Sequence, residues 1–148
     1  MAIETRYVAD ANLTVIAHVG QVSDNEFITF YSSFFAAGGL EPTSHLLVDL
    51  RLADSSSRSP AMLRKLADFI TCSPVHIPAR TKVAVVAPQD LAYGLARMYG
   101  ALADAVPWKF RVFRSVEDAE SWLAVPPGLA NDSDCSEVAT AGLAPTTV

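Results

Sequence analysis

Serine and charged residues follow one another in the stretch Asp54-Ser55-Ser56-Ser57-Arg58, just before a run with helical periodicity. Free amides and the helix dipole favour an anion at a helix N-terminus, so a phosphate on one of these serines would be stabilised there, with Arg58 close in sequence. An ordinary flexible loop in which one serine caps the helix explains the same composition. The stretch is therefore a candidate phosphorylation or partner-binding loop, with the plain loop as its alternative.

Five further polar residues lie in or after two apolar runs, 45–50 and 83–87. If both runs are parallel strands, their carboxyl ends meet at one edge of the sheet, where α/β proteins form a crevice. A carboxylate is costly to bury unpaired, so a structural pairing with a neighbour is the alternative role of such residues. The candidate crevice consists of Asp49, Arg51, Asp90, Tyr93 and Arg97.

No pattern typical of catalysis or metal binding accompanies these residues. His18, His45 and His76 are scattered, without a nearby nucleophile pattern or metal-ligand spacing, and no Gly-rich phosphate-binding motif is present. Cys72 and Cys135 form no CxxC pair, which favours free thiols in a reducing compartment. We expect no enzymatic activity, no metal and no cofactor. An enzyme that uses the polar crevice is a further alternative.

An aromatic concentration marks the first predicted helix. Five rings cluster on one side of it, and aromatic side chains dominate burial in both cores and interfaces. Packing against the sheet is one interpretation, and the lining of a pocket for an apolar ligand or a partner is the other. The rings belong to Phe27, Phe30, Tyr31, Phe34 and Phe35.

Alternation, apolar periodicity and turn residues predict nine elements. The first two strands form a hairpin, and two helices begin with capping boxes, Ser23 with Glu26 and Ser115 with Asp118. The elements are strands 3–8 and 13–19, helix 24–37, strand 45–50, helix 61–71, strand 83–87, helix 91–104, strand 108–113 and a closing helix after Ser115. The order ββαβαβαβα predicts a single-domain α/β fold with a mixed sheet of about five strands, an N-terminal hairpin followed by β-α repeats.

The third predicted helix carries one apolar stripe that we expect to lie on the sheet, with Asp90 as its N-cap. The stripe consists of Leu91, Leu95, Met98, Leu102 and Val106.

Composition limits the domain count and the partners. A chain of 148 residues, 51% of them hydrophobic, is expected to form one domain over 1–125, while 126–148 lacks periodicity and is expected to be a disordered tail. Most of the net charge of −5 comes from acidic residues in that tail, so the body offers no basic surface for nucleic acid. Lys109, Arg111 and Arg114 fit an edge strand. No apolar run approaches the ~20 residues that span a bilayer, and no signal peptide is visible, so we expect a cytoplasmic protein.

Residues 83–99, VAVVAPQDLAYGLARMY, and 110–123, FRVFRSVEDAESWL, resemble the SpoIIAA-like branch of the STAS superfamily. These small bacterial domains are related in fold to anti-sigma-factor antagonists and, more distantly, to lipid-transfer domains. The similarity covers about residues 3–125 in element order and is close in wording over 83–123. It implies a mixed sheet wound through β-α turns, no enzymatic activity and a binding role.

In the antagonists, a serine of an Asp-Ser-Ser-Gly motif after the third strand is phosphorylated and controls the choice of partner. Asp54-Ser55-Ser56 matches the first three positions, and Ser57 stands in place of the glycine. The resemblance implies a regulatory module that binds a protein partner through the 54–58 loop. As the alternative, the lipid-transfer relatives imply a small apolar or amphipathic ligand between the Phe-rich helix and the sheet. An exposed edge strand would permit a homodimer.

Overall fold

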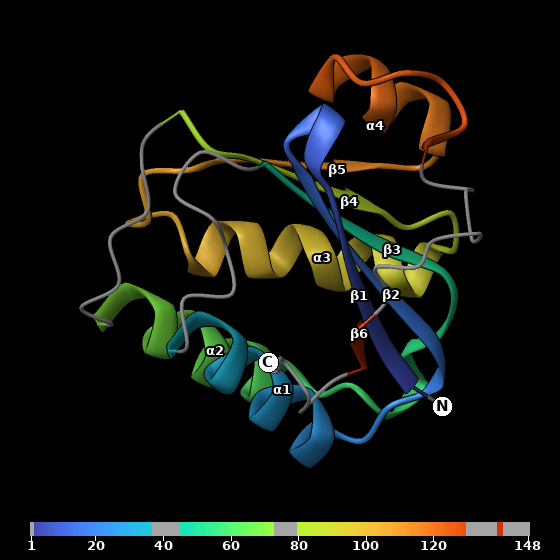
Figure 1. Cartoon of the computed structure of the whole chain (residues 1–148). Helices are drawn as coiled ribbons and strands as arrows, with labels where there is room; N and C mark the ends of the chain where they lie inside the picture. Colours follow the sequence, from blue (N-terminus) through green and yellow to red (C-terminus); the bar gives the residue numbers. More distant parts are fainter. Residues whose placement is uncertain (1, 37–44, 73–79, 130–138, 141–148) are drawn as a thin grey trace.

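The computed structural model describes residues 2–36, 45–72, 80–129 and 139–140. Figure 1 shows the elements in space. They are β1 (Ala2–Val8), β2 (Leu13–Gln21), α1 (Asp24–Ala36), β3 (His45–Asp54), the 3₁₀ turn η2 (Ser55–Ser57), α2 (Pro60–Cys72), β4 (Lys82–Val86), α3 (Asp90–Leu102), β5 (Lys109–Phe113), α4 (Val116–Leu123) and β6 (Ala139–Thr140).

One mixed sheet organises these elements. Its strand order is β5-β4-β3-β2-β1-β6, and β1 is antiparallel to β2, whereas β2, β3, β4 and β5 are mutually parallel. The predicted α/β architecture, a hairpin followed by β-α repeats, is confirmed. β5 is an edge strand, as the alternation of its basic residues predicted, and the two-residue β6 pairs with β1 only at Glu4 and Thr5.

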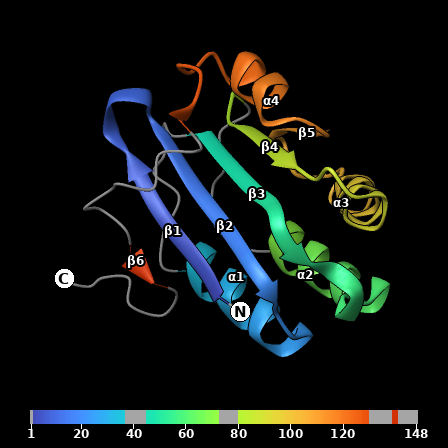
Figure 2. The same cartoon turned by 90° about the vertical axis from the view of Figure 1, so that its right-hand side faces the viewer.

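Helices cover both faces of the sheet, because alternate side chains of each inner strand point to opposite sides. Figure 2 shows α4 on one side and α1, α2 and α3 on the other. Leu46 and Val83 pack in the cluster under α1 and α2, whereas their neighbours Leu47 and Ala84 pack with α4. The two faces therefore carry separate cores.

Of the two predicted capping boxes, the one at α1 is complete and the one at α4 is observed in part. Ser23 N donates to Glu26 Oε1 (2.9 Å), and Glu26 N donates to Ser23 Oγ (3.1 Å), so α1 begins with a complete box. At the start of α4, Asp118 N donates to Ser115 Oγ (3.1 Å). Each contact satisfies an amide that the first helical turn leaves without an intrahelical partner.

The predicted start and packing face of α3 are wrong in detail. The N-cap is Gln89, with no side-chain cap, and Asp90 is the first helical residue. Leu91 and Met98 are exposed (52% and 38%), whereas Ala92 is buried. Small residues of the helix face the sheet instead. The approach is close, since a Cβ on Gly100 would come within 2.8 Å of the Phe110 ring. Of the predicted stripe, Leu95 and Leu102 are half-buried and Val106, beyond the helix end, is buried.

The third strand is longer than predicted and carries a bulge opposite His18. It continues to Asp54, whereas the apolar run suggested an end at residue 50. Ala17 pairs with Asp49 but Val19 pairs with Leu52, so β3 holds one extra residue there. A bulge of this kind redirects the following side chains. As a result, Val48, Leu50 and Ala53 all line one cavity, although strict alternation would turn Ala53 away.

Parts of the segment predicted to be a disordered tail make contacts with the body. Arg6 Nη2 donates to the Leu129 carbonyl (3.0 Å), Gly128 N donates to Glu120 Oε1 (3.1 Å), and β6 pairs with β1. Residues 130–138 and 141–148, like Cys135, lie outside the described residues, and for them the tail stays a prediction.

Candidate functional site

The serine loop forms a compact turn at the end of β3. The Asp54 carboxylate accepts from Ser56 N (3.0 Å), and hydrogen bonds from Ser56 hold the pKa of Asp54 below its usual range. Gln21 Nε2 donates to Ser56 Oγ (3.3 Å), and Ser56 is exposed. Ser55 is half-buried, and the side chain of Ser57 lies outside the described residues. Phosphorylation of this turn stays a prediction.

Arg58, which lies close in sequence to these serines, already has partners. Its Nη1 donates to Asp24 Oδ1 (2.8 Å), its Nη2 donates to the Val22 carbonyl (2.8 Å), and its guanidinium lies 4.0 Å from the centre of the Phe27 ring. The Arg58 side chain is only 8% exposed. A phosphate on the turn would have to compete with the Asp24 carboxylate for this cation.

The observed contacts of the predicted crevice residues fall into two groups, and a single crevice formed by all five stays a prediction. Asp49 pairs with Arg51 on the same strand, Arg51 Nη2 donating to Asp49 Oδ2 (2.8 Å). The hydrogen bonds with Asp49 raise the pKa of Arg51. The negative charges of Glu117 and Glu120 on α4 raise it further. Asp49 therefore has the structural role that was the alternative, on the face of the sheet that α4 covers.

The other three crevice residues gather at the start of α3. Arg114 Nη1 donates to Asp90 Oδ1 (2.6 Å), and the guanidinium lies 4.2 Å from the centre of the Tyr93 ring. The guanidinium of Arg97, an exposed residue, lies 5.9 Å from the centre of the same ring. Asp90 is 93% exposed in its side chain, so this is a solvated surface cluster. The β3–β4 register ends at Asp49, which pairs with Val86.

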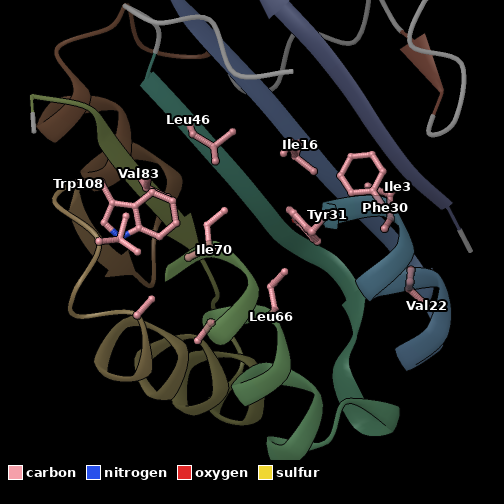
Figure 3. Packing of buried hydrophobic residues seen from close by; sticks show 13 residues of the cluster. Ile3, Ile16, Val22, Phe30, Tyr31, Leu46, Leu66, Ile70, Val83 and Trp108 are labelled. Atoms are coloured by element: carbon pink, nitrogen blue, oxygen red, sulfur yellow. The ribbon is translucent and has the colours of Figure 1, made fainter. Parts of the chain in front are cut away.

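A mainly apolar cavity of about 100 Å³ lies between the sheet and helices α1, α2 and α3. The strands contribute alternate side chains from one face, and the helices contribute the residues that meet them. Figure 3 shows Tyr31, Leu66 and Trp108 of its wall within this layer. Asp54, which is exposed, also belongs to the lining, so this end of the cavity reaches the surface. The aromatic part of the wall consists of Phe27, Tyr31, Tyr99, Trp108 and Phe110.

The aromatic cluster of α1 divides between the two predicted roles. Phe30 is buried in the core and stacks on Phe34, with ring centres 5.7 Å apart. Phe27 and Tyr31 line the cavity. Core packing therefore describes Phe30, whereas Phe27 and Tyr31 line a cavity whose occupation by a ligand or partner stays a prediction. The side chain of Phe35 lies outside the described residues.

Polar groups inside the cavity come from His18, Tyr31 and Tyr99. His18 is 3% exposed, and its Nε2 lies 2.7 Å from the Tyr31 hydroxyl, within hydrogen-bond distance. Burial, helped by the positive charge of Arg58 and opposed by Asp49, lowers the pKa of His18 to about 4, so the ring is neutral near pH 7. Gly20, which also lines the cavity, has φ 74°, a conformation that favours glycine at this strand end.

The sequence offered little signal for the polar end of the cavity. His18 lies in an alternating strand, and no nucleophile or metal ligand accompanies it in sequence. Tyr99 lies one position after Met98 of the predicted stripe. Because the stripe was the wrong packing face of α3, Tyr99 was not predicted to line a cavity. Its spacing from Ala92 and Ala96, at seven and three residues, marks the face that is actually packed.

Potential metal ligands do not gather within the described residues, which contain no group of three or more His, Cys, Asp or Glu side chains placed to hold a metal ion. His45 Nδ1 accepts from Lys82 N (3.0 Å), and His76 lies outside the described part of the chain. None of the helices described has both the length and the apolar character needed to cross a membrane.

Comparison with known proteins finds no matching family model, no matching curated protein and no matching solved structure. The SpoIIAA-like resemblance of residues 83–123 therefore stays a prediction.

Proposed function

We propose that this chain is a binding protein that holds a small, mainly apolar ligand between its sheet and helices α1, α2 and α3. The observation that carries the proposal is the apolar cavity of about 100 Å³ with one end at the surface. A guest of matching shape would make the dispersion contacts that the cavity wall lacks and would remove apolar surface from water, so its binding should be favourable. The resemblance to the relatives of lipid-transfer domains points in the same direction.

Blocking the cavity tests this function. Ala96 lines it, whereas Ala101 is exposed on the same helix, so Ala96→Leu fills the cavity and Ala101→Leu is the matched control. We expect toluene, a small apolar probe, to raise the Tm of the wild type and of Ala101→Leu, and to leave that of Ala96→Leu unchanged. Native mass spectrometry of the purified protein would identify a natural guest. If toluene changes neither the Tm nor the NMR spectrum of the wild type, the proposed function is wrong.

A second candidate function is regulated binding of a protein partner through the 54–58 loop. It is supported by the resemblance to the anti-sigma-factor antagonists and by the exposed end of β3, where Leu52 is 71% exposed and the strand has passed the end of its pairing with β4. The exposed Ser56 would be accessible to a kinase. This function, like the first, assigns no catalytic step to the chain, and it assumes the cytoplasmic location expected from the sequence.

Affinity capture from cytoplasmic extract tests this second function. The baits are the intact chain, a variant with Ser55, Ser56 and Ser57 replaced by Ala, and Leu52→Ser. We expect phosphate on the turn of the intact bait and a regulatory protein that the variants fail to capture. Identical partners for all three baits, with an unphosphorylated turn, would contradict it.

A further inference from the structure

Two polar groups of the cavity wall have hydrogen-bonding capacity that the described residues do not use. His18 Nε2 is paired with Tyr31, but Nδ1 of the same ring has no partner among the described residues. The Tyr99 hydroxyl likewise has none, although its ring contacts Trp108 and Phe110. Both side chains line the cavity. A molecule that occupies the cavity can supply the remaining partners, and buried polar groups such as the His18 ring are almost always hydrogen-bonded.

His18, Tyr31 and Tyr99 all line the cavity, and the first two are in contact. Burial and, after it, the neighbouring Tyr99 raise the pKa of Tyr31, whose hydroxyl is 2.7 Å from His18. Burial also raises the pKa of Tyr99. All three groups are thus uncharged near neutral pH, and they offer hydrogen bonds without a formal charge.

The charges nearby disfavour an ionised guest. Arg58, the cation of the lining, is neutralised by Asp24 at 2.8 Å. The other charged residue of the lining is Asp54, at the open end. An anion would lose hydration and meet no unpaired cation, and a cation would meet Arg58.

We propose that the cavity selects a compact neutral molecule that is apolar except for one hydroxyl or carbonyl group, which hydrogen-bonds to His18 and Tyr99. This inference rests on the proposed function, because it names the class of ligand that the same cavity takes. The rings of the wall contact the apolar part of the molecule, and the polar pair determines its orientation.

Three probes of similar size test the class by calorimetric titration: toluene, 4-methylphenol and 4-methylbenzoate. A hydrogen bond to an otherwise unpaired buried group is worth about 1 kcal/mol, so 4-methylphenol should bind the wild type roughly fivefold more tightly than toluene. 4-Methylbenzoate should bind more weakly than either. Equal affinities for toluene and 4-methylphenol, or a tightest fit for the benzoate, overturn the inference and leave the proposed function standing. Failure of all three to bind refutes both.

Removal of single hydroxyls assigns the contacts. Tyr99→Phe deletes a hydroxyl that has no partner among the described residues, so it should keep or raise the Tm while lowering the preference for 4-methylphenol over toluene at least about threefold. Tyr7→Phe is the matched control, since the Tyr7 hydroxyl lies outside the cavity, 3.2 Å from Asn12. An unchanged preference in Tyr99→Phe contradicts its role.

The role of His18 is tested by NMR in the wild-type protein, because a variant at this buried position could fold poorly. In a sample with ¹⁵N-labelled imidazole, 4-methylphenol should shift the Nδ1 resonance of His18, and toluene should shift it much less. The His45 ring, bonded to Lys82 N away from the cavity lining, serves as the internal control. Equal shifts with both probes would overturn the contact.

Discussion

Arg58 and Asp24 join the start of α2 to the start of α1 across 34 residues of chain, with 2.8 Å between Nη1 and Oδ1. Ser59 Oγ adds a hydrogen bond to the other carboxylate oxygen, also 2.8 Å. Although partial burial opposes it, the hydrogen bonds from Ser59 and Arg58 lower the pKa of Asp24. This pair therefore holds the two helices together beside the mouth of the cavity.

Asp24→Asn should destabilise the protein by about 2 kcal/mol, because it leaves the nearly buried Arg58 guanidinium without a counter-charge. Asp90→Asn is the control. The Asp90–Arg114 pair is solvent-exposed, so its loss should produce no measurable change. Urea unfolding of both variants at pH 7 measures the difference. Equal losses would show that the Asp24 pair has no special structural role.

Two glycines of α3 should respond to alanine in opposite ways. Gly100→Ala places a Cβ 2.8 Å from Phe110 Cδ1, an overpacking that should cost about 1–3 kcal/mol. A Cβ on Gly94 would meet no other atom within 4 Å, so Gly94→Ala should stabilise the helix by about 0.5–1 kcal/mol. Chemical denaturation checks both, and a stabilising Gly100→Ala would contradict the close approach of α3 to β5.

His18 should lower the free energy of unfolding as the pH is lowered. The folded pKa is about 4 against an ordinary 6.5, so between these values the unfolded chain binds a proton that the folded chain does not. The free energy of unfolding should therefore rise with pH from about 4 to 6.5, by up to about 1.4 kcal/mol per unit, and level off above.

His18→Phe isolates this contribution, since every other titrating group remains. Unfolding curves at pH 5, 6 and 7 should show a shallower dependence for the variant than for the wild type. Tyr31, Arg58 and Asp49 are the titratable or charged groups that contact or influence the ring, and all three are unchanged in the variant. Parallel curves for the two proteins would contradict a neutral, buried His18.

An exchange of caps tests the start of α3. Gln89 has the extended backbone of an N-cap, with φ −86° and ψ 145°, but its side chain makes no cap hydrogen bond. Gln89→Ser should stabilise the protein by about 1 kcal/mol, and the reverse exchange at α4, Ser115→Gln, should destabilise it by a similar amount. Thermal and urea unfolding measure both. If Gln89→Ser leaves the stability unchanged, water satisfies the backbone amides of the first turn of α3 equally well.

Local patterns in the sequence were sufficient for the architecture. Hydrophobic alternation, continuous apolar runs and two capping boxes are properties of neighbouring residues, so they predicted the hairpin, the β-α repeats and the starts of α1 and α4. The edge position of β5 followed from its basic alternation in the same way.

The tertiary structure decided the site. Whether Leu91 or Ala92 of α3 meets the sheet depends on how closely the helix approaches Phe110, a contact that no local pattern contains. Arg58 lies close in sequence to the serine loop, yet a carboxylate 34 residues away neutralises it. The extra residue of β3 opposite His18 redirects Ala53 into the cavity. The cavity is the space that the sheet and three helices leave between them, so only their three-dimensional arrangement brings His18, Tyr31 and Tyr99 together.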